Sequence, residues 1–399
     1  MFDIESTRVR GILTFVQKGR VPIILGICSK HVSTRNHTHE DHPTRQAGIL
    51  LALKEVSKEI SHTLLPSIDP AITQIKTISK IDYVLASPWS FVRTRTITEE
   101  YDKPHMVSDK DIQRILEHER ADFETLYTEG KFADTFDFDL EFIEEYIVDI
   151  RQNGYSVPRI EKAAVRKLEV SYISGIASGD FLKAMRKAVH EYIHAPEEHV
   201  HSSLVLQYTA LRHIVKEEEY MWIHIHGGVT DIISVIRSVP KNFATLPYGL
   251  KHVTEKVAHS LKISTPIAES VIHMHSEGHN QPKEAELAYG TKKESERIEH
   301  ALETAGSEWF KQVLAEFRTL NEVSVLPAHV LVWAHERSAY FAHHITNNEL
   351  PADIVARDRL RTDTITFGFV ENYVGFHASS HKSLLVGMYA IALYNHMLK

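Results

Sequence analysis

The order of hydrophobic and polar positions along the chain predicts alternating strands and helices. The first apolar runs, RGILTFV and VPIILGIC, are separated by a polar break at Lys18-Gly19, which predicts a β-hairpin. A helix is expected from about 46 to 64, where apolar residues recur at helical spacing. A second hairpin pattern, MWIHIHGGVTDIISVI, begins the second half of the chain. Two similar halves, each beginning with a hairpin, predict an α/β fold.

A small α+β module interrupts the first half of the chain. The composition changes near Pro104, and Ser108 precedes a helical pattern as its N-cap, with Asp111 three residues later. Two predicted strands follow, FIEEYIVDIRQ and RKLEVSYISGIAS, and the first of them ends at an Asn-Gly turn. The acidic run at 134–146 is expected to be a solvated strand edge or loop, or alternatively a surface that docks a basic peptide.

The rest of the chain continues the alternation. Helices are predicted at 179–193 and 199–215, and strands are predicted in PAHVLVW and TDTITFGFV. The region 250–325 is predicted to be mainly helical. Trp89 follows a Ser-Pro break between two strands, and it is expected to belong to the core rather than to anchor a partner peptide.

Composition excludes several classes of protein. With 43% hydrophobic and 25% charged residues, the chain of 399 residues can bury a large core. A net charge of −8 provides no basic field for nucleic acid. One cysteine, Cys28, excludes a disulfide framework and fits a reducing compartment. The first residues lack the apolar region of a signal peptide, and the longest apolar run, SLLVGMYAIALYNHML, is too short for a membrane span and predicts a buried helix.

Histidines are abundant, and two of them suggest a metal site as one alternative. His224 and His226 alternate on a predicted strand, so both rings point to one face and could bind one ion. The runs HTHEDH and HMHSEGH would have to supply further ligands, but neither has strand context. The 27 histidines are also scattered over the whole chain. A histidine-ligated metal hydrolase is therefore the weakest of the alternatives.

A phosphate site explains more of the residues near this hairpin. A Gly227-Gly228 tip exposes backbone N–H groups that can bind phosphate, and Thr230 and Asp231 follow it directly. The start of the chain, DIESTRVR, has a similar strand and turn. Two such hairpins, one per half, would face each other across a cleft. The alternative is turn chemistry, which itself favours Ser, Thr and Asp.

These motifs resemble those of the bacterial actin-like proteins of the FtsA/PilM family. The positions kept in register with the family pattern are Gly227, Gly228, Thr230, Asp231, Pro247, Gly249, Leu261, Lys262, Ala268 and Glu269. The start, DIESTRVR, resembles the family's first phosphate loop. The resemblance covers essentially the whole chain.

The resemblance implies a two-lobed actin-like fold with a third, inserted part. The first actin-like subdomain (1A) would comprise 1–103 and 175–219, and an SHS2 (1C) module would occupy 104–174. The second half, 220–399, would be subdomain 2A with a 2B-like helical insertion at about 250–325. The residues that would contact a nucleotide are Asp3, Ser6, Thr7, Gly227, Gly228, Thr230, Asp231 and Glu269.

The departures from the family pattern all fall on the expected nucleotide site. Glu5 replaces a glycine of the first loop and adds a negative charge near the phosphates. His224 stands where the family has the acid that positions Mg²⁺, and His226 and Val229 replace a glycine and a hydroxyl residue. Ile272 stands at the family's lysine position, and VLVWAHERSAY lacks the glycines of the nucleoside loop. We therefore expect a degenerate ATP site, with no cofactor required and only low affinity for ATP and Mg²⁺.

The implied function is that of a scaffold at the inner face of the plasma membrane. The closing helix is followed by no amphipathic membrane-binding tail, which resembles PilM more than FtsA and predicts no direct membrane insertion. The partner would be the peptide tail of a bitopic membrane protein, or a pilus or division protein, and a homo-oligomer or filament is compatible with the family. The chief alternative is an active, nucleotide-switched filament-forming ATPase.

Overall fold

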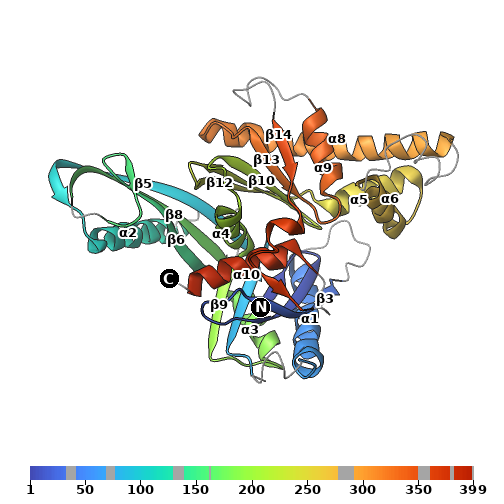
Figure 1. The fold of residues 1–399 in the computed structure, drawn as a ribbon, viewed down its shortest axis with the longest axis horizontal. Coiled ribbons are helices and arrows are strands. Elements are labelled where there is room, and N and C mark those ends of the chain that lie inside the picture. The colour runs from blue at the N-terminus through green and yellow to red at the C-terminus, as the bar shows by residue number, and fades with distance from the viewer. Residues whose placement is uncertain are drawn as a thin grey trace.

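The computed structural model of the chain describes residues 1–32, 42–68, 77–128, 139–160, 163–276, 292–348, 360–377 and 382–397. The described strands form three sheets, and Figure 1 shows two of them in separate lobes and the third in a module that projects to one side. The α/β fold predicted from the alternation of strands and helices is confirmed.

The first lobe is built on a six-stranded sheet. In order across the sheet, its strands are β15 (Gly375–Phe376), β3 (Ile23–His31), β2 (Arg8–Phe15), β1 (Phe2–Ile4), β4 (Lys80–Leu85) and β9 (Glu197–Ser202). The strands β1 and β2 form the predicted hairpin, and β1 also pairs in parallel with β4. The helices α1 (His42–Glu59) and α3 (Gly179–His190) and the π-helix η1 (Ile60–Leu64) bury one face of this sheet.

The second lobe repeats this arrangement on a five-stranded sheet. Its strands are, in order, β12 (Val239–Leu246), β11 (Thr230–Ile236), β10 (Tyr220–Ile225), β13 (His329–Trp333) and β14 (Arg361–Thr364). Again a hairpin strand, β10, pairs antiparallel with its neighbour β11 and parallel with a later strand, β13. The helices α5 (Leu250–Leu261), α6 (Thr265–Ser276), α8 (Lys292–Val323) and α9 (Ser338–Asn347) share its outer core.

Two helices join the lobes. The helices α4 (Ser203–Ile214) and α10 (Leu384–Met397) pack on each other, and their apolar side chains belong to one core with residues of both sheets. Ile12 and Val84 come to this core from the first sheet, and Trp222 and Leu331 come from the second. Figure 1 shows α10 crossing the middle of the molecule. The predicted buried helix near 384–397 is confirmed, and no helix among the described residues is long and apolar enough to cross a membrane.

The projecting module has its own sheet and core. Its strands are β5 (Ser90–Met106), β8 (Ala164–Ser178), β6 (Leu140–Gln152) and β7 (Tyr155–Val157), and α2 (Asp109–Thr128) packs against them. The predicted Asn-Gly turn between β6 and β7 is confirmed, with positive φ angles of 52° and 84° at Asn153 and Gly154. Strand β5 runs through the predicted boundary at 103/104, and the division into domains stays a prediction.

Two predicted elements are wrong in part. The segment 199–215 is predicted as one helix, but β9 precedes α4 because residues from Glu197 onward pair with β4. The segment 362–370 is predicted as a strand, but β14 ends at Thr364 and a 3₁₀ helix, η2 (Phe367–Phe369), follows. The runs HTHEDH and HMHSEGH and the start of the acidic run lie wholly or partly outside the described residues.

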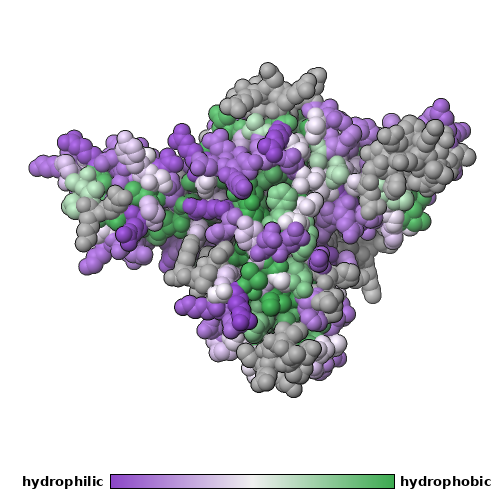
Figure 2. Space-filling view, viewed as in Figure 1, coloured by the Kyte–Doolittle hydropathy of each residue, from purple (hydrophilic) through white to green (hydrophobic). Residues whose placement is uncertain are grey.

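The distribution of surface polarity follows this architecture. In Figure 2, hydrophobic side chains gather in the middle of the visible face, whereas the module and the opposite side, with α5, α6 and α8, are mostly hydrophilic.

Trp89 is only 4% exposed, and its indole stacks on Phe181 with ring centroids 4.8 Å apart. Its Nε1 donates a hydrogen bond to the carbonyl of Glu5 at 3.2 Å, so the core assignment of Trp89 is confirmed.

Candidate functional site

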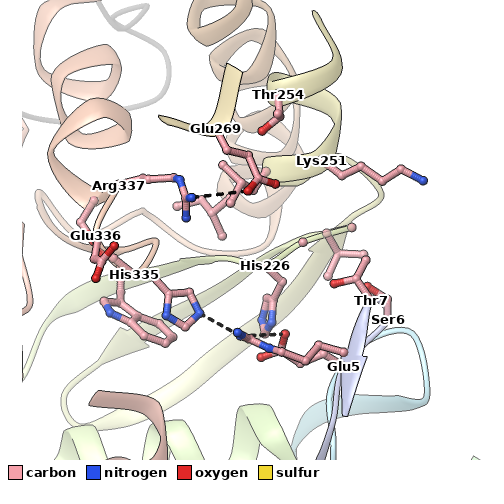
Figure 3. Close-up of a pocket in the computed structure, with 18 of the residues that line it drawn as sticks. Glu5, Ser6, Thr7, His226, Lys251, Thr254, Glu269, His335, Glu336 and Arg337 are labelled. Carbon is pink, nitrogen blue, oxygen red and sulfur yellow. Dashed lines mark hydrogen bonds and ion pairs between the residues drawn. The ribbon is translucent and has the colours of Figure 1, made fainter. Parts of the chain in front are cut away.

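A cleft of about 1810 Å³ lies between the tips of the two hairpins and the segments behind them. The β1–β2 tip contributes Glu5 to Arg8, and the β10–β11 tip contributes His226 to Val229. The start of α5 and the segment between β13 and α9 line further parts of it, as Figure 3 shows for Lys251 and His335. The two sheets repeat one topology, and each tip directly follows the first strand of its hairpin, β1 in one sheet and β10 in the other.

The two hairpin tips are in contact. A methyl group on Gly227 would lie 2.2 Å from the Thr7 hydroxyl oxygen, and one on Gly228 would lie 2.8 Å from the Ser6 hydroxyl oxygen. Only glycine allows so close an approach of the second tip to the first. A further link between the lobes joins the hydroxyl groups of Ser87 and Thr245 at 3.0 Å. The lobes therefore meet at the hairpins.

Charged side chains of the first hairpin lie at the bottom of the cleft and in the buried layer directly beneath it, which together we call its floor. Asp3 and Arg10 lie opposite each other in the β1–β2 register, and the Arg10 Nε donates a hydrogen bond to the Asp3 carboxylate at 2.7 Å. The same guanidinium forms an ion pair with Glu5. Arg8 reaches Glu5 at 3.5 Å from the other side, and its NH2 group lies 3.3 Å from His335 Nε2. Two arginines thus face two carboxyl groups, as charges removed from water require.

The second hairpin contributes a buried histidine–aspartate pair. His226 Nε2 lies 2.8 Å from the Asp231 carboxylate, and both side chains are almost fully buried. Burial lowers the pKa of His226, but the interactions with Asp231 and the charges of Glu5 and Asp3 together outweigh burial, and the net pKa is raised. Asp231 also accepts a hydrogen bond from the Thr245 hydroxyl at 2.6 Å. Asp231 therefore favours the charged form of His226.

The other two histidines of the floor are neutral. Burial, and then the charge of His226, lower the pKa of His224 well below its ordinary value, and its ring lies between those of His226 and Trp333. Burial and the charges of Arg10 and Arg8 lower the pKa of His335 to about 3. A neutral His335 can accept the hydrogen bond that Arg8 donates, which fixes the remaining proton on its Nδ1.

The eight residues predicted from sequence occupy two different environments. Those that line the cleft are Ser6, Thr7, Gly227, Gly228 and Glu269. Asp3, Thr230 and Asp231 are fully buried beneath it. The Thr230 hydroxyl donates a hydrogen bond to the carbonyl of Tyr248 at 2.7 Å and accepts one from the Trp309 indole at 3.0 Å. Both of its hydrogen bonds therefore lie within the second lobe.

Glu269 lies at the opposite wall of the cleft. It extends from α6 and is about half exposed, and its carboxylate lies 3.8 Å from Arg337 (Figure 3). Ile272, which follows it on the same helix, is fully buried in the core of the second lobe. Glu269 and the hairpin tips therefore share one cleft.

Sequence reasoning missed two cations of the floor, Arg8 and Arg10, and the neutral His335. The hairpin register was the signal that could have found Arg10, since a tip of four residues between the paired positions 4 and 9 places residue 10 opposite residue 3. His335 comes from the segment after β13, and no local pattern predicts its contact with Arg8. Among the described residues, no group of three or more His, Cys, Asp or Glu side chains has the arrangement of a metal site.

Comparisons with known proteins bear on the fold. No protein-family model matches the chain. A search of curated proteins finds no match either. The chain is similar to a solved structure of the PilM–PilN type IV pilus biogenesis complex, with a TM-score of 0.59 and 13% identity over 100% of this chain and 97% of that chain.

Two further solved structures are similar over about half of this chain. The ethanolamine utilization protein EutJ from Carboxydothermus hydrogenoformans has a TM-score of 0.32 and 16% identity, over 55% of this chain and 62% of that one. A MamK double helical filament has a TM-score of 0.34 and 14% identity, over 55% of this chain and 66% of that one. From its two repeated lobes and its match to PilM along the full length, the chain has an actin-like fold.

Proposed function

We propose that the chain is an actin-like scaffold in type IV pilus assembly that binds a peptide segment of a membrane protein and does not hydrolyse ATP. The observation that carries this proposal is the match to PilM over the full length of both chains, the module included. PilM in that structure is in complex with PilN, so a PilN-like membrane protein is the partner we propose. Attachment through such a partner would place this chain at the inner face of the membrane.

The floor of the cleft supports a scaffold over an ATPase. A magnesium–nucleotide complex needs free carboxylates or waters around the ion, because Mg²⁺ takes oxygen ligands in an octahedron. Here Asp3 and Glu5 form ion pairs with Arg10, and Asp231 lies against His226, so none of these carboxylates is free. The tips that would bind phosphates also touch each other at Thr7 and Gly227. These residues do not fit Mg–ATP in the arrangement they adopt, and we assign them no catalytic step.

One observation favours the rival function, a nucleotide-switched ATPase. The backbone amides of Gly227 and Gly228 donate no hydrogen bond to another described residue, so the second tip keeps donors that could meet a phosphate. Binding at this tip would require the lobes to separate. The rival therefore predicts a conformational change on addition of Mg–ATP.

Two titrations distinguish the functions. Peptides covering the cytoplasmic segments of inner-membrane pilus proteins from the same genome are titrated against the purified chain by fluorescence anisotropy. In parallel, Mg–ATP is titrated by calorimetry, and phosphate release is followed. We expect saturable binding of one peptide, no heat with ATP at about 1 mM, and no phosphate release above the buffer rate. Micromolar Mg–ATP binding with hydrolysis, and no peptide bound, would establish the rival.

A further inference from the structure

Glu5 occupies an unusual position for a carboxylate. It lies at the tip of the first hairpin, where its backbone N–H donates to the carbonyl of Arg8, and the residue is only 4% exposed. Its side chain does not point into water, although the tip lines a large cleft. Figure 3 shows it turned toward the floor, beneath His226 and His335. A buried charge of this kind is costly unless cations surround it.

Cationic and polar groups from separate segments converge on this carboxylate. Arg10 and Arg8 come from β2, and both form ion pairs with it. His226 at the end of β10 and His335 after β13 lie close enough for their charged forms to influence it. Burial raises the pKa of Glu5, but Arg10 and Arg8 together lower it to about 2, so the group is ionised. The surroundings of Glu5 therefore have the composition of an oxyanion site.

Some donors in these surroundings have no partner. The Ser6 hydroxyl oxygen and the Arg8 Nε are buried and make no hydrogen bond to the residues that the structure describes. Ser6 is only 5% exposed and lines the cleft. Gly227 and Gly228 lie against the same tip, and their amides donate no hydrogen bond to another described residue. A two-oxygen carboxylate does not satisfy all the donors present, whereas a phosphate-class anion offers more acceptor atoms.

We propose that Glu5 is an internal anion that fills an oxyanion site formed by Arg8, Arg10 and the Ser6 hydroxyl, and that its removal opens this site to phosphate-class anions without a divalent cation. The inference rests on the proposed function in one respect, since both require that the wild-type cleft holds no Mg–nucleotide. In this arrangement the chain supplies from its own Glu5 side chain the negative charge that a ligand would otherwise bring.

The test removes the carboxylate and supplies a free anion. Pyrophosphate is titrated by calorimetry, with EDTA present, into the wild type, Glu5→Gly and Glu5→Gln. We expect no binding by the wild type at about 1 mM, and binding by Glu5→Gly that is at least about tenfold tighter. Glu5→Gln should gain less, because its amide still fills the space. Pyrophosphate should also raise the melting temperature of Glu5→Gly and leave that of the wild type unchanged.

Matched variants assign any gain to this site. Glu336→Gln removes a carboxylate from the same cleft without touching the floor, and it should gain no binding. Arg8→Met in the Glu5→Gly background should abolish the gain, because it removes a cation that faces the anion. If Glu5→Gly does not fold in plain buffer, refolding with and without pyrophosphate replaces the titration, and rescue by the anion is the expected result.

Other outcomes overturn the inference. Wild-type protein that binds pyrophosphate as tightly as Glu5→Gly would show that Glu5 does not occupy the site. If Glu5→Gly folds but gains no affinity for pyrophosphate, or if pyrophosphate does not help it to refold, the residues around Glu5 do not form an anion site. A gain in affinity that needs Mg²⁺ would mean the same. These results leave peptide binding by the wild type intact, so they are distinguishable from failure of the scaffold function, which appears as wild-type ATP hydrolysis without peptide binding.

Discussion

His201 connects the first lobe to the module through two carboxylates. It lies on β9, 3.1 Å from Asp82 of β4 and 3.8 Å from Glu144 of β6. Burial lowers the pKa of His201, but the hydrogen bonds to Asp82 and Glu144 raise it by more, so that the net pKa is about 9. Asp82 in turn has its pKa lowered to about 2, because His201 and Lys80 outweigh the effect of burial. The cluster is thus intact only while the imidazole is protonated and Asp82 is ionised.

We predict a specific pH dependence of stability from this residue. The folded pKa of His201 lies above its ordinary 6.5, so its contribution is complete below that pH and is lost as the pH rises through about 9. His201→Gln should therefore lower the free energy of unfolding by on the order of 2 kcal/mol at about pH 6, and by little at about pH 10. Urea unfolding at both pH values measures the difference. An equal loss at both would mean that the contribution of His201 is independent of its charge.

At the residue scale, sequence reasoning located the cleft but not its chemistry. Gly227, Gly228, Ser6 and Thr7 line it, because turn residues are recognisable locally, whereas their contact with a nucleotide stays a prediction. Thr230 was expected near phosphates, yet its hydroxyl bonds to groups of the second lobe's core. Those partners arrive from segments distant in the sequence. The direction in which a polar side chain such as that of Thr230 turns is therefore set by tertiary structure.

At the scale of elements, the close packing of α8 on α9 depends on one glycine. A methyl group on Gly306 of α8 would lie 1.9 Å from Nε2 of His344 on α9. His344 is only 1% exposed, and burial lowers its pKa to about 4, so the ring is neutral. The imidazole lies over the helix backbone where any other residue would have a side chain.

This contact reverses a usual effect of substitution. Alanine normally stabilises a helix relative to glycine by about 1 kcal/mol, but we expect Gly306→Ala to destabilise this chain by roughly 1–3 kcal/mol because the methyl group overlaps the ring. The double variant Gly306→Ala, His344→Ala should be more stable than His344→Ala alone, because the added methyl group then no longer meets the ring. Thermal unfolding measures all three. A higher melting temperature for Gly306→Ala alone would contradict the packing described.

The elements that sequence reasoning found and missed differ in what stabilises them. The hairpins have local signals, namely turn residues and alternating side chains, and they were predicted with their turns. Strand β9, with the sequence EEHVHS, has no such signal and is held by parallel pairing to β4, whose residues lie more than a hundred positions earlier. Its strand conformation is thus imposed by the sheet.

At the scale of the whole molecule, the contact of the hairpin tips sets the separation of the lobes. We predict that Gly227→Val increases this separation, because its side chain would overlap Thr7. The radius of gyration from X-ray scattering should rise, and cleavage by protease near the tips should become faster. Gly368→Ala is the matched control, since the nearest atom to its added methyl group lies 3.7 Å away. Unchanged scattering by Gly227→Val would mean that Thr7 moves aside and that the tips do not determine the separation.

The position of α10 has a consequence for synthesis of the protein. This helix lies in the core that both sheets share, yet the ribosome adds residues 384–397 only after nearly all of both lobes. Until then, the apolar faces that carry Trp222, Val84 and Leu331 have no cover from α10. Nascent chains of this protein should therefore present a hydrophobic surface to chaperones until translation has passed residue 397, because neither lobe can complete its core during elongation.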